Sequence, residues 1–112
     1  MAQKTLTIGE KKVNFKITGY TPLMYKAMHG SDFLKDFMAM EKAYANDEAP
    51  DLDTFYKVSY CLAKKANEDI PTMEEWLDSF DSFPVADVVN ELIPLIQANF
   101  TSTVKKNPAK KK

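Results

Sequence analysis

Four carboxylates between positions 47 and 53 form the densest acidic cluster of the chain. They are Asp47, Glu48, Asp51 and Asp53. Carboxylate oxygens are the ligands that Ca²⁺ prefers, so a metal site would be sought here first. The spacing differs from that of an EF-hand loop, however, and the central glycine of such a loop is missing. We therefore interpret the cluster as a solvated loop followed by a helix cap, and we expect no metal site.

The residues that most often perform acid–base or nucleophilic chemistry occur singly. His29 is the only histidine and Cys61 the only cysteine. No second histidine or thiolate can complete a metal site, and no internal disulfide can form. Each of Ser59, Ser79 and Ser82 would need a base to activate its hydroxyl, and the sequence suggests none. The chain is therefore expected to be neither an enzyme nor a cofactor-binding protein.

The most informative stretch is residues 72–100, TMEEWLDSFDSFPVADVVNELIPLIQANF, which carries large apolar side chains on two helix-like runs. Thr72 and Glu75 have the spacing of a capping box, so a short helix is predicted to begin there. After Pro84, apolar residues recur at helical intervals and predict a second helix. Pro94 lies inside that run and should kink it, because proline removes one backbone hydrogen bond.

We take the large apolar residues of this stretch as candidates for contact with a partner. Aromatic side chains stabilise cores and interfaces alike, so Trp76, the only tryptophan, could equally anchor the core. A role in binding requires that Trp76, Phe83 and Ile96 be partly exposed in the free protein. The candidate contact residues are Trp76, Phe80, Phe83, Leu92 and Ile96.

Two N-terminal runs, KTLTI and KVNFKI, alternate apolar and polar residues and are separated by GEKK. This pattern predicts a β-hairpin with a four-residue loop. Pairing Ile8 with Val13, and Leu6 with Phe15, would place the large apolar groups on one face. Because two strands alone are marginally stable, helices must cover that face or another subunit must extend the sheet.

Periodicity and capping residues predict three further helices, over about 22–29, 32–45 and 52–66. Thr21 before Pro22 should cap the first helix, and Ser31 the second. The third is apolar around more than half of its circumference, which is typical of a helix that is central to a core or shared with a partner. The predicted fold class is α+β, an N-terminal β-hairpin packed on about five mostly short helices.

Methionines and phenylalanines gather in the first two of these helices. Two interpretations stay open for this group: core filling, or an adaptable surface on which flexible thioethers repack against varied apolar partners. The second helix has a stripe of Phe33, Phe37, Met40 and Tyr44, which Leu34 and Met38 widen. The methionines concerned are Met24, Met28, Met38 and Met40.

The 112 residues have the size of one domain, and we assign residues 1–103 to it. All 15 basic residues are lysines, and residues 1–103 carry 10 of them against 16 acids, a net charge of −6. We expect a disordered basic tail over residues 104–112, whose lysines are Lys105, Lys106, Lys110, Lys111 and Lys112. An acidic body without arginine argues against sequence-specific nucleic-acid binding. No apolar run is long enough for a membrane span, and the N-terminus lacks the apolar core of a signal peptide.

The order of these features resembles the tail assembly chaperones of long-tailed phages and prophages of Gram-positive bacteria. The resemblance covers nearly the whole chain. It rests on the paired strands, the middle helix DLDTFYKVSYCLAKKAN, the EEWLDSFDSF segment, the apolar helix that ends in QANF, and the lysine-rich end. It is a similarity of overall pattern, without a catalytic signature.

The resemblance implies a non-enzymatic protein that binds the tape measure protein and keeps it soluble until the tail tube polymerises. It also implies self-association, the major tail tube protein as a further partner, residence in the cytoplasm of the bacterial host and absence from the mature virion. Two alternatives remain from other classes. One is a phage regulator that binds nucleic acid nonspecifically through its lysine tail, and the other is a structural tail-completion protein.

Overall fold

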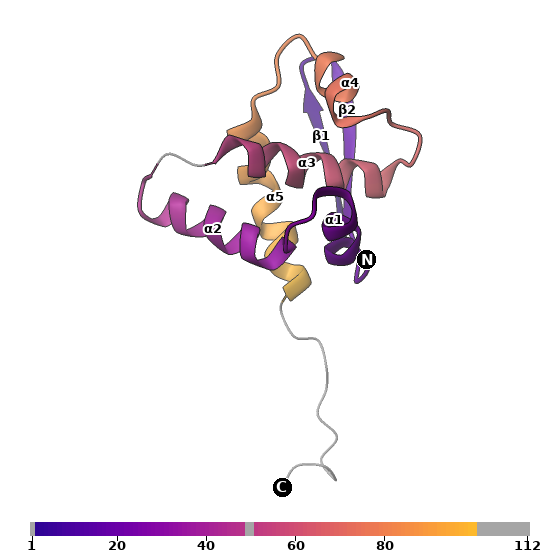
Figure 1. The fold of residues 1–112 in the computed structure, drawn as a ribbon. Helices are drawn as coiled ribbons and strands as arrows, with labels where there is room; N and C mark the ends of the chain where they lie inside the picture. The colour runs from indigo at the N-terminus through magenta and orange to yellow at the C-terminus, as the bar shows by residue number, and fades with distance from the viewer. Residues whose placement is uncertain (1, 49–50, 101–112) are drawn as a thin grey trace, which may run out of the picture.

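A computed structural model describes residues 2–48 and 51–100 of the chain. This part holds a two-stranded antiparallel hairpin followed by five helices, which confirms the predicted α+β class (Figure 1). The expected basic tail, residues 104–112, lies outside the described residues. The elements are β1 (Ala2–Ile8), β2 (Lys11–Ile17), α1 (Thr21–His29), α2 (Phe33–Ala45), α3 (Leu52–Ala66), α4 (Met73–Asp78) and α5 (Val85–Phe100).

The hairpin turns over two residues, so the predicted four-residue loop is wrong. Leu6 pairs with Val13 and Ile8 with Lys11, a register shifted by two from the predicted one. Gly9 takes a φ of 65°, the sign that the first central position of a two-residue hairpin turn requires and that glycine adopts readily. A shift of two residues keeps every side chain on its face, so the predicted apolar face is still correct.

The core is built around α3, which crosses the apolar face of the hairpin and packs against α1 and α5 (Figure 1). Phe55, Val58 and Leu62 of this helix are fully buried, together with Cys61. Even Ser59 is fully buried, and its hydroxyl donates a hydrogen bond to the Phe55 carbonyl at 2.9 Å. Such all-round burial explains the broad apolar stripe in the sequence, which identifies α3 as the central helix.

The last helix, α5, lies against α3 and the hairpin and buries its apolar stripe there. The helix α5 continues through Pro94, and the predicted kink at that point stays a prediction. Pro94 is exposed, and so is Asn90, whose carbonyl loses its helical partner; water can therefore solvate the free carbonyl. None of the described helices combines the length and hydropathy that a membrane span requires.

Two of the predicted caps differ from the observed ones. Asp32, and not Ser31, caps α2: its carboxylate accepts a hydrogen bond from the Lys35 amide at 3.0 Å. Thr21 lies inside α1, and its hydroxyl accepts a hydrogen bond from the Thr18 amide at 2.8 Å. The Thr72 cap of α4 is confirmed, because its hydroxyl oxygen accepts a hydrogen bond from the Glu75 amide.

Shortening a buried side chain of α3 should cost far more stability than shortening an exposed side chain at the start of the same helix. We expect Phe55→Ala or Leu62→Ala to lower the free energy of unfolding by about 2–5 kcal/mol, because each leaves a cavity in the core. Leu52→Ala is the matched control, since Leu52 begins the same helix and is 48% exposed; it should cost less than about 1 kcal/mol. Urea unfolding of the three variants measures these differences. Equal losses at all three positions would mean that α3 is misplaced.

Candidate functional site

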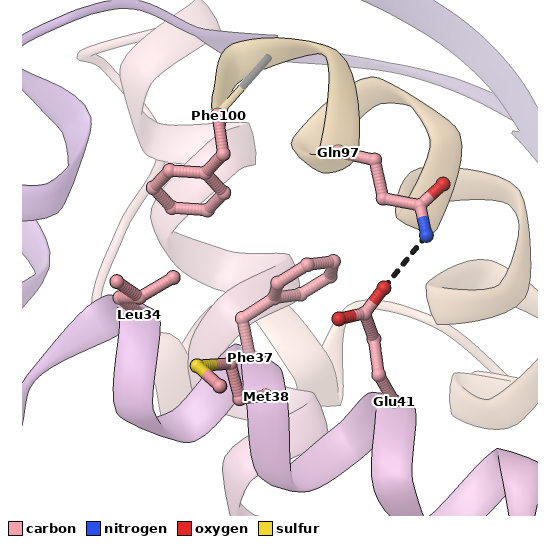
Figure 2. Close-up of a pocket in the computed structure, with 6 residues that line it drawn as sticks. All are labelled: Leu34, Phe37, Met38, Glu41, Gln97 and Phe100. Atoms are coloured by element: carbon pink, nitrogen blue, oxygen red, sulfur yellow. Dashed lines mark hydrogen bonds between the residues drawn. The ribbon is translucent and has the colours of Figure 1, made fainter. Parts of the chain in front are cut away.

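An apolar groove lies between α2 and the end of α5 (Figure 2). Leu34, Phe37 and Met38 of α2 line it, and Phe100 of α5 lies across from them. It encloses about 250 Å³, below the roughly 300–1,000 Å³ of typical small-molecule pockets. The groove therefore has room for one or two side chains of a partner rather than for a cofactor.

Glu41 and Gln97 form the polar edge of this groove. The Gln97 amide nitrogen donates a hydrogen bond to the Glu41 carboxylate at 2.6 Å and links α2 to α5 (Figure 2). This bond lies at the surface, so its contribution to stability is modest, but it fixes the spacing of the two helices there. The groove thus combines an apolar floor with one carboxylate at its edge.

Helical geometry explains why apolar side chains are left outside the core at this place. The buried side of α2 is formed by Phe33, Phe37 and Met40. Leu34 and Met38 each follow a buried phenylalanine by one residue, about 100° further around the helix, and remain 44% and 58% exposed. Phe100 is 38% exposed and lies about 6 Å, between ring centroids, from Phe33 and Phe37. We call Leu34, Met38 and Phe100 the groove strip.

The sequence left Met38 open as part of an adaptable surface but did not single out Leu34 or Phe100, although Leu34 and Met38 were visible as an i, i+4 pair beside the main stripe. That pair is the signal that could have found the site. Of the methionines with two open interpretations, Met40 is buried, Met24 and Met28 are half-buried, and Met38 is exposed. Met38 is therefore the one that meets the requirement for an adaptable surface.

Three of the predicted contact residues belong to an aromatic cluster around α4. Trp76 is only 5% exposed, and the rings of Tyr60, Phe80 and Phe83 surround it at centroid distances of 5.3–5.6 Å. Phe80 and Phe83 are half-buried. The expectation that Trp76 is partly exposed is thus corrected: its indole packs against neighbouring rings and anchors α4.

Polar contacts tie the aromatic cluster to the rest of the domain. The Lys11 ammonium donates a hydrogen bond to the Ser79 carbonyl at 2.6 Å and lies 4.9 Å from the centre of the Phe80 ring. The Tyr60 hydroxyl donates a hydrogen bond to the Pro71 carbonyl at the start of this segment. Strand β2 and α3 therefore both hold α4 in place.

Leu92 and Ile96, the other two predicted contact residues, are fully buried. Both lie on the side of α5 that packs into the main core. Neither offers a surface to a partner in this conformation, so the expectation that Ile96 is partly exposed is corrected as well. The apolar stripe of α5 is needed to cover α3 and the hairpin, because two strands alone leave too much apolar area open.

The residues considered for catalysis lie apart from the groove. Cys61 is fully buried in α3, and burial raises the pKa of its thiol to about 12, which keeps it protonated and unreactive. Two of the four carboxylates between 47 and 53 have structural roles: Asp51 caps α3, and Asp53 pairs with Lys57 at 3.0 Å. In the described ranges, 2–48 and 51–100, no three metal-ligating side chains converge.

His29 packs at the end of α1, where its ring meets the Tyr25 ring edge to face at 5.0 Å. Its Nε2 atom is buried without a hydrogen-bond partner. Burial lowers the pKa of His29, and the nearby Lys57 charge adds to that effect. The imidazole is thus a neutral packing group, and it is too isolated to act as a general base.

The predicted electrostatic residues of the tail lie outside the described part of the chain, which ends at residue 100. They are Lys105, Lys106, Lys110, Lys111 and Lys112.

Comparison of the chain with protein-family models, curated proteins and solved structures finds no match.

Stability should depend on pH through His29. Its pKa is lowered in the folded protein, so the unfolded chain takes up the proton first as pH falls below about 6.5. Stability from this group is complete above that pH and is lost as pH falls toward the folded-state pKa. We expect wild type to lose more stability than His29→Gln between pH 7.5 and 5.5 in urea unfolding. An identical loss in both proteins would exclude His29 as the cause.

The burial of Trp76 predicts a spectroscopic result. Its fluorescence emission should be blue-shifted in the native protein and poorly quenched by acrylamide, because the indole is surrounded by rings. Unfolding in urea should shift the emission to the red and make it quenchable. The single tryptophan makes the signal unambiguous. Native emission already typical of solvated indole would place Trp76 back on the surface.

Proposed function

We propose that this protein is a phage tail assembly chaperone, which binds the tape measure protein and keeps it soluble during tail morphogenesis. The observation that carries the proposal is the groove strip, an exposed apolar surface on a small domain whose core is already filled. Contiguous exposed apolar groups are typical of protein-binding surfaces. The resemblance of the sequence pattern supports the identity of the client.

The mechanism is stoichiometric binding without chemistry. Leu34 and Met38 have flexible side chains that can repack against client segments of different shapes. Each contact would be weak, because the groove admits only one or two side chains. A long helical client offers many such segments, so repeated weak binding along it yields high overall avidity.

Under this proposal the protein acts in the cytoplasm of the bacterial host and leaves the assembly before the virion matures. Self-association on the client, and contact with the major tail tube protein, belong to the same proposal. The aromatic cluster now has a supporting role: Trp76 stabilises α4, and half-buried Phe80 and Phe83 remain as secondary contact candidates.

Co-expression with the tape measure protein of the same genome tests the function. Wild type should keep the client in the soluble fraction, whereas Leu34→Ser/Met38→Ser should lose this ability. The two substitutions together remove about 2 kcal/mol of apolar contact from each binding event, which corresponds to a loss of roughly 30-fold in affinity. Calorimetry with a soluble client fragment can measure this loss.

The matched control is Leu23→Ser/Leu52→Ser, which removes two exposed leucines on α1 and α3, away from the groove. It should solubilise the client as well as wild type. Circular dichroism checks that both double variants fold. A wild-type protein that never engages the client would contradict the function, and equal losses in both double variants would contradict the site.

A further inference from the structure

One edge of the hairpin offers backbone hydrogen-bonding groups to a further strand. In an antiparallel pair, residues that bond to the neighbouring strand alternate with residues whose amide and carbonyl point away from it. Ile8 and Lys11 flank the two-residue turn and pair with each other, so the even-numbered residues of β1 bond to β2. Gln3, Thr5 and Thr7 therefore direct their amides and carbonyls outward. Among the described residues, these backbone groups have no hydrogen-bond partner.

The outer edge of β1 lacks the features that usually keep an edge strand single. Proteins protect a long edge with a charge, a proline or a bulge. The solvent-facing side chains of Gln3, Thr5 and Thr7 are exposed and uncharged. The one charged residue of β1 is Lys4, which lies on the apolar face and pairs with Glu91 of α5 at 2.9 Å. Another strand can therefore extend the sheet at this edge.

The opposite edge of the hairpin, on β2, is less suited to pairing. Lys12 and Lys16 lie on its solvent face, on either side of Asn14. Two β2 edges paired antiparallel about Asn14 would set Lys12 of each copy opposite Lys16 of the other, and like charges directly opposite each other are destabilising. The segment that carries α4 also lies beside β2, because both line a common cavity of about 240 Å³. The edge of β1 is thus the one available.

We infer that two copies of this chain pair through their β1 edges, antiparallel and with a two-fold axis at Thr5. In this register Thr5 faces Thr5 of the second copy, and Gln3 faces Thr7. Three amides from each copy then donate to carbonyls of the other, which gives six hydrogen bonds in all. A shift of two residues in either direction leaves four within β1. The two hairpins together form a four-stranded sheet, which is more stable than two strands alone.

The side chains of this edge are complementary to a second copy of themselves. On the solvent face, threonine and glutamine meet across the axis, and threonines favour strands and pair well with each other. On the apolar face, Lys4 of one copy lies opposite Leu6 of the other, so no like charges are opposed. Leu6 is half-buried, and the added strand covers part of its remaining surface. A second copy therefore satisfies the backbone and the side chains of the edge together.

This inference deepens the proposed function, on which the use of self-association rests, by assigning that association to a surface. No residue of β1 lines the groove between α2 and α5. Pairing at the β1 edge therefore leaves the grooves of both copies open. A dimer with two open grooves binds a long client with higher avidity than one copy does.

Sedimentation velocity over a concentration series up to about 0.5 mM tests the pairing. Wild type should form a dimer. Thr5→Pro should weaken it at least about tenfold, because both amides at the axis are lost, whereas the hairpin keeps its bonds. Asn14→Pro is the matched control, since Asn14 faces Thr5 across the hairpin and both changes remove the same side-chain hydrogen bond. It should dimerise within about twofold of wild type. Circular dichroism checks that both variants fold.

A charge swap tests the same axis without proline. Thr5→Lys and Thr5→Glu each place like charges opposite each other, so each should dimerise about fivefold less tightly than wild type. A mixture of the two variants places opposite charges there instead. The mixed dimer should be at least about fivefold tighter than either homodimer. A mixture of Asn14→Lys and Asn14→Glu should show no such preference.

Three results would overturn the inference. Wild type could stay monomeric across the series, or folded Thr5→Pro and Asn14→Pro could weaken the dimer equally. The dimer could also be lost in Leu34→Ser/Met38→Ser and kept in Thr5→Pro, which would place the contact in the groove. Client solubilisation is measured separately with the same proteins. Wild type that dimerises without engaging the client would reject the proposed function alone, and a monomeric wild type that keeps the client soluble would reject this inference alone.

Discussion

The burial of α3 on nearly every side is the constraint on which the rest of the fold depends. A two-stranded hairpin cannot stand alone, and Phe55, Val58 and Leu62 cover its apolar face. The helices α1 and α5 cover the remaining sides of α3. The apolar stripe of α5 is buried in this contact. Because α2 contributes only one side to this core, its other apolar residues stay outside. The groove is thus a consequence of how the small core is closed.

The aromatic cluster around Trp76 solves a different problem. The six-residue helix α4 is too short to be stable on its own, so ring packing and the Lys11 and Tyr60 hydrogen bonds must hold it. A segment held by a few side chains opens at a lower free energy than the main core does. The aromatic side chains therefore have two different roles. The rings around Trp76 hold α4 against the domain, whereas Phe100 borders the exposed groove.

Periodicity and capping residues were sufficient to predict the hairpin, the helices and the class of fold. The bounds of α3 follow from its apolar stripe, and α4 begins where the Thr72 capping box predicts. The binding site was harder to predict than the fold, because a large apolar residue looks the same in a sequence whether it faces the core or a partner. Trp76, Leu92 and Ile96 were candidates for contact with a partner, yet tertiary packing buries all three. Leu34 and Met38 lie at the edge of the apolar stripe of α2. Whether residues at that edge are buried depends on how closely α1 and α3 pack against α2, which the local sequence does not specify.

The central claim is that a client is held by the open side of α2 and the end of α5. Hydrogen–deuterium exchange of the chain with and without a soluble fragment of the tape measure protein tests it most directly, because each peptide amide reports its own protection. The account predicts added protection over residues 33–41 and 97–100, with the segment 72–84 unchanged. Added protection confined to 72–84, with the groove exchanging as in the free protein, would contradict it and place the binding surface at the aromatic cluster.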